Sequence, residues 1–342
     1  MVNQRPIIGI SMGDPAGIGP EIAVKALARK EVYEVCNPIV VGDSSVIEAA
    51  VRIGKLNLSV RPVTEVEDAK FEYGAIDVFD LNNVDISKLQ YGKVSAEAGN
   101  AGFMAVKKLI ELAMAKKIDA TVTGPINKEA MNLAGHHFSG HTEIYAEFTG
   151  TKDYTMMLAH ENFRVAHVST HVSLRQACDR VKKERVFKVI QLSYEAARKL
   201  GIEKPRIGVA GLNPHAGENG MFGREEIEEI TPAIEAAKAQ GILAEGPVPP
   251  DSLFPKGKSG FYDVVVAMYH DQGHIPLKLA GFNWNETTKR WESVNGINIT
   301  LGLPIIRSSV DHGTAFDIAG KGIATPESLL SAIEYAQKMA RL

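Results

Sequence analysis

Short apolar runs alternate with longer helical patterns along most of this chain, and the alternation limits the folds that the sequence can adopt. We expect strands at Ile7–Ser11, Pro38–Gly42, Ala75–Phe79, Ile118–Thr123, Arg206–Ala210 and Val264–Met268. Helical patterns lie between them at Pro20–Arg29, Asp43–Gly54, Ser95–Lys116, Val186–Leu200 and Glu225–Gln240. Strands that alternate with helices are typical of a mostly parallel sheet covered on both faces. The sequence therefore predicts an α/β fold.

The chain has 342 residues, which is more than the roughly 250–300 residues that a single hydrophobic core usually serves. We therefore expect two α/β lobes. Two short runs, Thr155–Leu158 and Arg164–Ser169, are close enough to form an antiparallel hairpin. The polar stretch Asn283–Asn295 contains both tryptophans and is expected to be an inserted loop or hairpin. A final helix is expected from Thr325–Pro326, with Thr325 as its cap, to about Met339.

Composition excludes several classes of protein. With 38 Lys+Arg, 41 Asp+Glu and a formal net charge of −3, the chain lacks the positive field that non-specific nucleic-acid binding requires. Two cysteines, Cys36 and Cys178, are too few for a disulfide framework and are typical of thiols in a reducing cytoplasm. We see no signal peptide and no apolar stretch of about 18 residues, so we expect a cytoplasmic protein without a membrane span.

The first motif with possible chemistry is the glycine-rich run Gly13–Glu21, GDPAGIGPE, between an expected strand and an expected helix. Such a loop can line a ligand cleft at the carboxyl end of a strand, and its cofactor-binding candidates are Gly13, Asp14, Gly17 and Gly19. The alternative is a glycine-rich turn that binds nothing. The spacing is G-x-x-x-G-x-G and differs from the dinucleotide fingerprint G-x-G-x-x-G, so any nicotinamide cofactor must bind in another way.

Three histidines each follow an expected strand: His171, His215 and His270. Three neutral imidazoles with open positions are a ligand set for catalytic zinc or a similar divalent ion. The alternative is three unrelated loop histidines, because their spacing is long-range and forms no local motif.

Candidate anion-binding residues occur in two other places. His141 and Thr142 lie at the start of an expected helix, where an anion is favoured, although a helix cap without a ligand is as common. Lys278 and Arg307 are the cations that could bind a phosphate or carboxylate. Taken singly, each of these cations is more often an ordinary surface charge.

Taken together, the motifs resemble the 4-hydroxythreonine-4-phosphate dehydrogenase (PdxA) family. Nine runs carry the resemblance in the family's order: Gly13–Glu21, Thr123–Lys128, Gly140–Glu143, Ser169–His171, Asn213–Glu218, Phe222–Glu226, Met268–Gly273, Asn298–Arg307 and Asp311–Asp317. They span almost the whole chain, and nine matches in order are far more specific than any one of them.

The resemblance implies an isocitrate/isopropylmalate-dehydrogenase-like fold with two α/β/α lobes and a cleft between them, formed by residues 1–127 plus 298–342 and by residues 128–297. It implies a homodimer whose active sites use both subunits, with NAD or NADP and a divalent metal such as Zn, Mg, Mn or Co. The implied metal ligands are His171, His215 and His270. The implied substrate contacts are His141, Thr142, Lys278, Asn298 and Arg307, and Lys278, Asp271 and Asp251 are the catalytic candidates.

Within this family, His167–His171 and Gly273–Lys278 are similar to the second-type branch. That branch is associated with oxidising 4-phospho-D-threonate or 4-phospho-D-erythronate, followed by loss of carbon dioxide to give dihydroxyacetone phosphate. The extended segment Asn283–Asn295 departs from both branches. The alternatives are 4-hydroxythreonine-4-phosphate dehydrogenase of pyridoxal phosphate biosynthesis, a metal-dependent aldolase or hydrolase of a phosphorylated sugar, and a non-catalytic binding protein.

Overall fold

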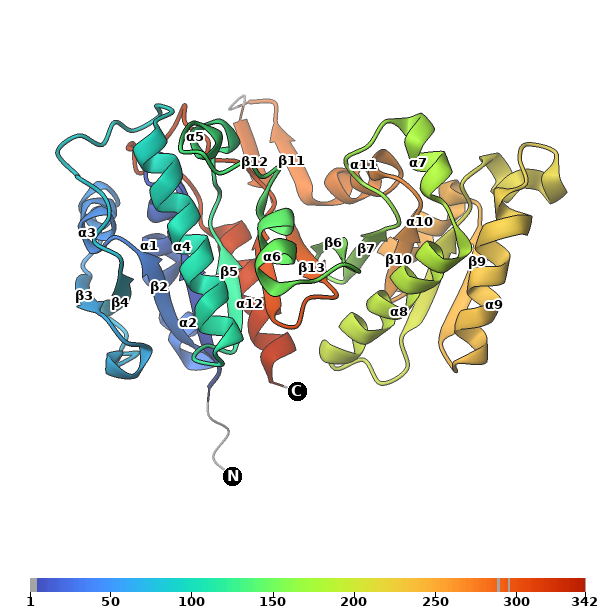
Figure 1. Ribbon diagram of the computed structural model, residues 1–342, viewed down its shortest axis with the longest axis horizontal. Helices are drawn as coiled ribbons and strands as arrows, with labels where there is room; N and C mark the ends of the chain where they lie inside the picture. Colours follow the sequence, from blue (N-terminus) through green and yellow to red (C-terminus); the bar gives the residue numbers. More distant parts are fainter. Residues whose placement is uncertain (1–4, 288–289, 295, 342) are drawn as a thin grey trace. The chain divides into compact units, whose positions relative to one another are not determined.

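The computed structural model describes residues 5–287, 290–294 and 296–341 and divides into two compact units. The first unit contains the chain up to Thr151 together with Leu303–Arg341, and the second contains Lys152–Gly302. Both units are α/β, as the alternation of strands and helices predicts (Figure 1).

The sheet of the first unit consists of six parallel strands in the order β3-β4-β2-β1-β5-β14. These strands are β1 (Ile7–Ser11), β2 (Asn37–Gly42), β3 (Ser59–Val63), β4 (Ala75–Asp80), β5 (Ala120–Thr123) and β14 (Ile306–Val310). Ser11 at the end of β1 pairs with Val41 and Thr123, so neighbouring strands end at the same level. The loops that follow β1, β5 and β14 therefore meet at one edge of the sheet.

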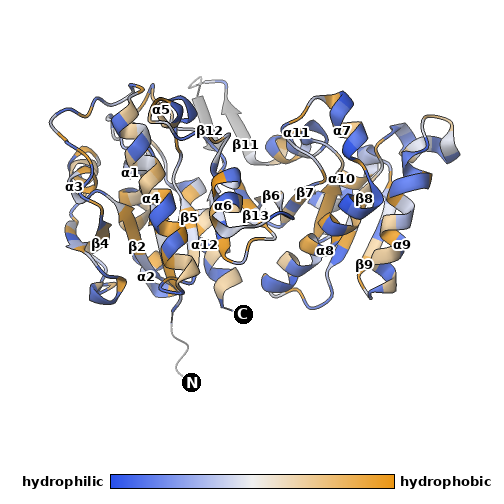
Figure 2. Cartoon of the chain, viewed as in Figure 1, coloured by the Kyte–Doolittle hydropathy of each residue, from blue (hydrophilic) through white to orange (hydrophobic). Residues whose placement is uncertain are grey.

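Helices cover both faces of this sheet. The helices are α1 (Gly19–Leu27), α2 (Lys30–Val35), α3 (Ser44–Ile53), α4 (Ala96–Met114), α5 (Lys128–Leu133), α6 (His141–Thr149) and α12 (Glu327–Ala340), with a short turn at Val66–Asp68. Helix α4 packs across β2, β1 and β5, whereas α12 packs on β14 and β5 beside α1. The strands between them are almost fully buried, and Figure 2 colours β2 as hydrophobic. Burial on both faces explains why these strands are continuous apolar runs.

The sheet of the second unit is mixed, in the order β13-β6-β7-β10-β8-β9. Its strands are β6 (Thr155–His160), β7 (Phe163–His167), β8 (Arg206–Ala210), β9 (Leu243–Val248), β10 (Val264–Ala267) and β13 (Ile297–Leu301). Strands β6 and β7 form the expected antiparallel hairpin, and β13 is antiparallel to β6. From β7 onwards the neighbours β10, β8 and β9 are parallel.

The helices of the second unit are α7 (Leu174–Arg180), α8 (Lys183–Lys199), α9 (Thr231–Ala239), preceded by a wide turn at Glu226–Ile230, α10 (Pro250–Lys258) and α11 (His270–Gly281). Helix α8 packs on β7, β10 and β8, and α9 packs beside it. Figure 2 shows hydrophilic and hydrophobic stretches alternating along α8, as one exposed and one buried side require. Helices α10 and α11 both pack on β7 and β10, around the core residues Leu158, Val165, Leu253, Val265 and Leu277.

Three details differ from the sequence expectation or sharpen it. Strands β11 (Phe282–Asn285) and β12 (Arg290–Val294) pair antiparallel, so the inserted segment is a hairpin; Asn295 lies outside the described residues. The last helix begins at Glu327 with Pro326 as its cap, and not with the expected cap Thr325. The changeovers between units lie at Thr151 and Gly302, later than residues 127 and 297.

The first changeover is late because α5 and α6 both pack against α4. Gly99 makes this contact possible, since a β-carbon there would lie 2.1 Å from the carbonyl carbon of Ala130 in α5. The sequence pattern of residues 128–149 gave no indication of which lobe these helices would join. The close contact between the backbones of α4 and α5 places α5 in the first unit.

We predict that Gly99→Ala lowers the free energy of unfolding by about 1–3 kcal/mol, because the methyl group forces α5 away from α4. In an unconstrained helix the same change raises the free energy of unfolding by about 0.5–1 kcal/mol. The sign of the change in Gly99→Ala therefore shows whether α5 packs closely against Gly99. Met104→Ala, at an exposed position of the same helix, is the control and should change stability by less than about 0.5 kcal/mol. Denaturant unfolding measures both, and a gain in stability for Gly99→Ala would contradict the packing described.

Candidate active site

The three candidate metal histidines all follow neighbouring parallel strands of the second unit. His171 follows β7, His270 follows β10 and His215 follows β8, and these strands are adjacent in the order β7-β10-β8. The carboxyl ends of parallel strands share one edge of the sheet, which is where ligand sites form in α/β folds. His270 is the first residue of α11 and does not lie on a loop as the sequence suggested.

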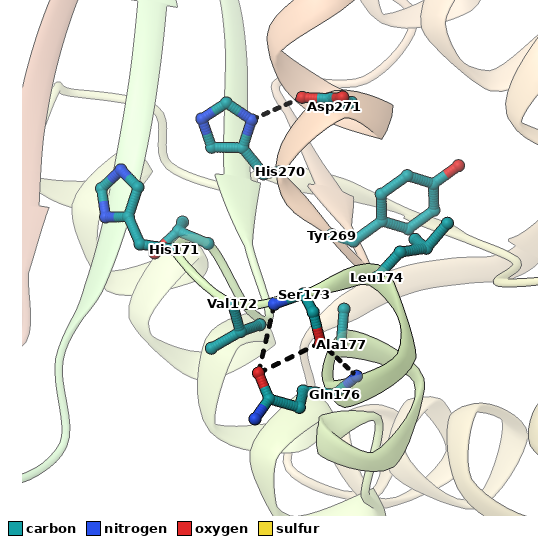
Figure 3. A pocket seen from close by; sticks show the side chains of 10 residues that line it. His171, Val172, Ser173, Leu174, Gln176, Ala177, Tyr269, His270 and Asp271 are labelled. Carbon is teal, nitrogen blue, oxygen red and sulfur yellow. Dashed lines mark hydrogen bonds and ion pairs between the residues drawn. The ribbon is translucent and has the colours of Figure 1, made fainter.

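An open pocket of about 560 Å³ lies beside the ends of β7 and β10 (Figure 3). The centroids of the His171 and His270 rings are 5.7 Å apart on its wall. Nδ1 of His270 lies 2.6 Å from Oδ1 of Asp271. A carboxylate can only accept this hydrogen bond, so Nδ1 carries a proton, and in the neutral ring Nε2 is then the nitrogen with the lone pair. In Figure 3 the ring nitrogen of His270 that is not bonded to Asp271 lies on the side facing His171.

His171 and His270 have a geometry that suits a shared divalent ion. Two imidazoles that bind one tetrahedral ion through bonds of about 2.0–2.1 Å have ring centroids about 5 Å apart, close to the separation in this chain. Carboxylate-bonded histidines are also the usual metal ligands. Within the described part of a single chain, however, no group of three or more His, Cys, Asp and Glu side chains is placed to hold a metal. The structure thus brings together two of the three predicted ligands.

His215 lies in a backbone segment of unusual conformation. The residues from His215 to Asn219 all have positive φ, so the segment Pro214–Gly220 turns in the left-handed sense. Non-glycine residues pay about 1–2 kcal/mol each for this conformation, and other contacts must therefore hold it. The carboxylate of Glu226 accepts hydrogen bonds from the backbone N–H of Leu212 at 2.8 Å and of Asn213 at 2.7 Å, and from the Asn213 amide at 2.9 Å. Glu226 is buried and anchors the start of the segment.

The first unit contains a separate group of predicted site residues around Arg307. The Arg307 side chain is only 2% exposed, its Nη2 donates to Oγ1 of Thr123 at 3.0 Å, and its guanidinium lies 5.6 Å from the ring centroid of Tyr145. Burial lowers the pKa of Arg307 to about 10, so the group stays cationic at neutral pH. Thr123 and Tyr145 were not identified from the sequence as site residues.

His141 and Thr142 begin α6, which brings them to the same region of the first unit as Arg307. Burial, and then the nearby charge of Arg307, lower the pKa of His141 well below its ordinary value, so its imidazole is neutral. Its Nε2 atom is buried and has no hydrogen-bond partner among the described residues. The N-cap residue of α6 is Gly140, which has no side chain to bond the first N–H groups of the helix. A buried cation beside the N-terminus of a helix is an arrangement that binds anions.

The loop Gly13–Gly19 also lies in the first unit, and its glycines have a structural explanation. β-Carbons at Gly13, Gly17 and Gly19 would lie 2.5 Å from the Pro125 carbonyl oxygen, 3.0 Å from Thr314 and 2.2 Å from the Met12 carbonyl oxygen. Gly13 and Gly17 therefore let the loops after β1, β5 and β14 pack closely, and Gly19 lets the loop after β1 fold back on itself. Their presence needs no ligand to explain it.

Asp14 is the polar group of this loop that its packing leaves unsatisfied. It is 1% exposed, and Oδ1 accepts from the backbone N–H of Ala16 at 2.9 Å. Oδ2 is buried and has no partner among the described residues. Burial raises the pKa of Asp14 to about 6. An orphaned carboxylate oxygen of this kind is suited to accept a hydrogen bond from a bound molecule.

The remaining predicted site residues belong to the second unit. Lys278 is half-buried on α11, and Asp251 is exposed in the first turn of α10. Asn298 lies on β13, where its Nδ2 lies 2.8 Å from Sδ of Met156. His141, Thr142 and Arg307 belong to the first unit, so the predicted substrate contacts come from both units.

Two further histidines lie behind His270, and the sequence named them only as parts of longer motifs. His274 stacks on His270, and its ring centroid is 4.7 Å from that of the fully buried His167. Burial lowers the pKa of His167 to about 3 and the pKa of His274 to about 4, so both rings are neutral. A helix prediction that started at His270 would have placed His274 on the same face, four residues later.

No helix among the described residues is both long and apolar enough to cross a membrane. Cys36 and Cys178 are both free thiols.

Comparisons with known proteins match nearly the whole chain. The family model described as "Pyridoxal phosphate biosynthetic protein PdxA" matches residues 34–336. A relative from Oceanobacillus iheyensis, named "Putative D-threonate 4-phosphate dehydrogenase", is 50% identical over 341 residues, 99% of either chain. One of the same name from Halalkalibacterium halodurans is 48% identical over 339 residues, 99% of this chain and 98% of its own. The crystal structure of 4-hydroxythreonine-4-phosphate dehydrogenase from Klebsiella pneumoniae superposes with a TM-score of 0.87 at 43% identity over 99% of both chains.

We predict that Asp14→Asn stabilises the ligand-free protein at neutral pH. The pKa of Asp14 is raised from 3.8 to about 6 on folding, so the folded state binds the proton more tightly and loses stability as the pH rises between these values. Asparagine keeps the bond to Ala16 and carries no charge. The free energy of unfolding of the variant should exceed that of the parent protein by up to about 3 kcal/mol above pH 6. This difference should become smaller towards pH 4.

Denaturant unfolding of the parent protein and the variant at several pH values between 4 and 8 measures this difference. A difference that stays constant over this range would show that Asp14 does not titrate as its burial implies.

Proposed function

Since the chain belongs to the PdxA family and is a dehydrogenase that acts on a secondary alcohol, we propose that it oxidises a four-carbon, 4-phosphorylated 3-hydroxy acid and decarboxylates the product. The preferred substrate is 4-phospho-D-threonate or 4-phospho-D-erythronate, and the final product is dihydroxyacetone phosphate. Relatives that are 48–50% identical over the full length and carry the D-threonate 4-phosphate name support this choice.

The observation that carries the proposal is the buried guanidinium of Arg307. This cation is 2% exposed, and a charge in such a low-dielectric environment attracts an anion strongly, so the guanidinium suits a substrate phosphate or carboxylate. Thr123 orients the guanidinium through its hydroxyl group. The first N–H groups of α6, including that of Thr142, add donors at the positive end of a helix, whereas the buried Nε2 of the neutral His141 can accept a hydrogen bond from a substrate hydroxyl. Lys278 is the proposed second cation that binds the charged end of the substrate.

His171, His215 and His270 are the proposed ligands of a divalent ion. Asp271 holds the proton of His270 on Nδ1 and so keeps Nε2 available as a ligand atom. A bound ion would stabilise negative charge on the substrate oxygen during oxidation and decarboxylation, and NAD or NADP would accept the hydride from C3.

For the nicotinamide cofactor, the loop Gly13–Gly19 offers one fitting group. The unsatisfied Oδ2 of Asp14 can accept a hydrogen bond from a hydroxyl or amide of the cofactor. The glycines keep the neighbouring loops close and so fix the position of Asp14. Asp251 and Asp271 stay candidates for proton transfer.

We further propose that the active protein is a homodimer. Large apolar side chains are exposed close in the sequence to each candidate metal histidine: Leu174, Met221, Phe222, Ile275 and Leu279. Apolar side chains such as these become buried when they lie in a protein interface, and burial of this kind favours association. Since His171 and His270 come together within one chain and the described part of that chain does not complete a three-ligand site, His215 of the partner subunit is the proposed third ligand.

The substrate proposal predicts a ranking that steady-state kinetics can measure. With NAD or NADP and a divalent metal, kcat/KM for 4-phospho-D-threonate or 4-phospho-D-erythronate should exceed that for 4-phosphohydroxy-L-threonine by about tenfold or more. D-threonate without its phosphate should be turned over about 100-fold less efficiently, because it lacks the dianion that Arg307 and Lys278 are proposed to bind.

The absorbance of reduced nicotinamide reports oxidation, and release of carbon dioxide reports decarboxylation. A clear preference for 4-phosphohydroxy-L-threonine would assign the chain to pyridoxal phosphate biosynthesis. Cleavage of the substrate without reduced nicotinamide would instead indicate an aldolase or a hydrolase.

The dimer proposal predicts complementation between inactive variants. If His171 and His270 come from one chain and His215 from the other, a mixed dimer of His215→Ala and His270→Ala contains one intact site. Equal amounts of the two variants, after subunit exchange, should regain about a quarter of the parent activity.

The control is a mixture of His171→Ala and His270→Ala, which should stay inactive because both losses affect the same half of each site. Activity that reappears equally in both mixtures, or a fully active monomer in sedimentation, would refute the arrangement.

A further inference from the structure

Four histidine rings of the second unit lie in a row that extends from the pocket into the core. The ring centroids are 5.7 Å apart between His171 and His270, 3.6 Å between His270 and His274, and 4.7 Å between His274 and His167. Only the His270–His274 pair is parallel, with an angle of 11° between the ring planes. The two inner rings belong to the runs His167–His171 and Gly273–Lys278, and neither His167 nor His274 has a role in the proposed function.

The plane of the His270 ring needs an external support. The torsion between Cβ and an imidazole ring is broad, so a histidine rotamer alone does not fix the ring plane. The hydrogen bond from Nδ1 to Asp271 fixes one atom of the ring, and Asp271 is itself 71% exposed at its side chain. A parallel ring at 3.6 Å is in van der Waals contact with the whole face of His270.

His274 is well placed to give this support because it is held in turn. It is 9% exposed, and its Nδ1 lies 2.9 Å from the backbone oxygen of His270, one helical turn earlier. His167 packs against its side, is fully buried, and lies with its own Nδ1 3.4 Å from the carbonyl oxygen of Met156. Gly273 allows the approach, since a β-carbon there would lie 2.4 Å from Nε2 of His167.

Burying two imidazole rings costs more folding free energy than burying two apolar side chains of similar size. Nε2 of His167 has no hydrogen-bond partner among the described residues, and an unsatisfied buried polar atom destabilises the fold relative to an apolar side chain. Leucine or phenylalanine would fill these positions at lower cost. A cost of this kind is typical of residues that serve a functional site.

We propose that His274 is a positioning residue, which fixes the plane of the His270 ring by stacking on it, with His167 as its support. This inference rests on the proposed function in one respect, namely that His270 binds a metal ion. Ligand side chains must be held within about 10–20° of their productive orientation for tight binding. The flat ring of His274, and not its hydrogen bond to the backbone, is the part that acts on His270.

Two substitutions separate the ring from the hydrogen bond. His274→Phe keeps a flat ring against His270 and loses the donor, whereas His274→Gln keeps a donor for the His270 carbonyl and loses the ring. The matched control is His136→Gln in the first unit, because the His136 ring also stacks on an aromatic ring, that of Phe103, at 3.7 Å and 15°.

The first measurement is the zinc affinity of each metal-free protein, by competition with a chromophoric chelator. His274→Gln should bind zinc about 10-fold or more weakly, whereas His274→Phe and His136→Gln should stay within about threefold of the parent protein. The second measurement is the orientation of the His270 ring in crystals of the metal-free variants. It should be single in the parent and in His274→Phe, and multiple or rotated in His274→Gln.

Either variant alone can overturn the inference. It fails if His274→Gln keeps both the zinc affinity and the ring orientation of the parent, or if His274→Phe loses them. Failure of the proposed metal site gives a different result: His270→Ala would then bind zinc as well as the parent protein, while the ring orientation in metal-free crystals would still decide whether His274 positions His270.

Discussion

The parallel alignment of β7, β10 and β8 is the constraint on which the candidate metal site depends. Val265 of β10 pairs with Val165 of β7 and with Gly208 of β8, so the three strands run in register and end together. Their continuations therefore begin at the same edge of the sheet and carry His171, His270 and His215. Each continuation then takes a different form: an exposed loop, the first turn of α11 and a left-handed turn anchored by Glu226. Pairing of the three strands brings the three histidines to one edge of the sheet, and the local structure after each strand sets the orientation of its histidine.

The first unit uses the same principle for a different chemistry. Strands β1, β5 and β14 are parallel neighbours, and the loops after them are joined by hydrogen bonds from Asp14 N–H to the Pro125 carbonyl and from Ile18 N–H to the Thr314 carbonyl. Glycines permit these approaches. The result is a closely packed edge with the buried carboxylate of Asp14, while the buried Arg307 lies on β14 itself. One unit thus holds groups suited to anions and the other holds groups suited to a metal.

The sequence predicted the parts of this arrangement that depend on local patterns. Strand–helix alternation predicted the α/β class. The position of each histidine after a strand identified His171 and His270, whose ring centroids are 5.7 Å apart in the structure. It did not predict features that depend on contacts between distant segments. Gly99 and Ala130 decide that α5 joins the first unit, and the buried carboxylate of Glu226 shapes the turn at His215. The stacking of His274 on His270 became visible only once α11 was seen to begin at His270.

The central claim is that histidines at these strand ends hold a divalent ion in a site shared by two chains. The most direct measurement is anomalous X-ray diffraction from crystals of the zinc-loaded protein. The account predicts one ion at each site, bonded at about 2.0–2.1 Å to Nε2 of His270, with His171 of the same chain and the partner subunit's His215 as the other protein ligands. An ion bound elsewhere, or an ion held by Nδ1 of His270, would contradict it.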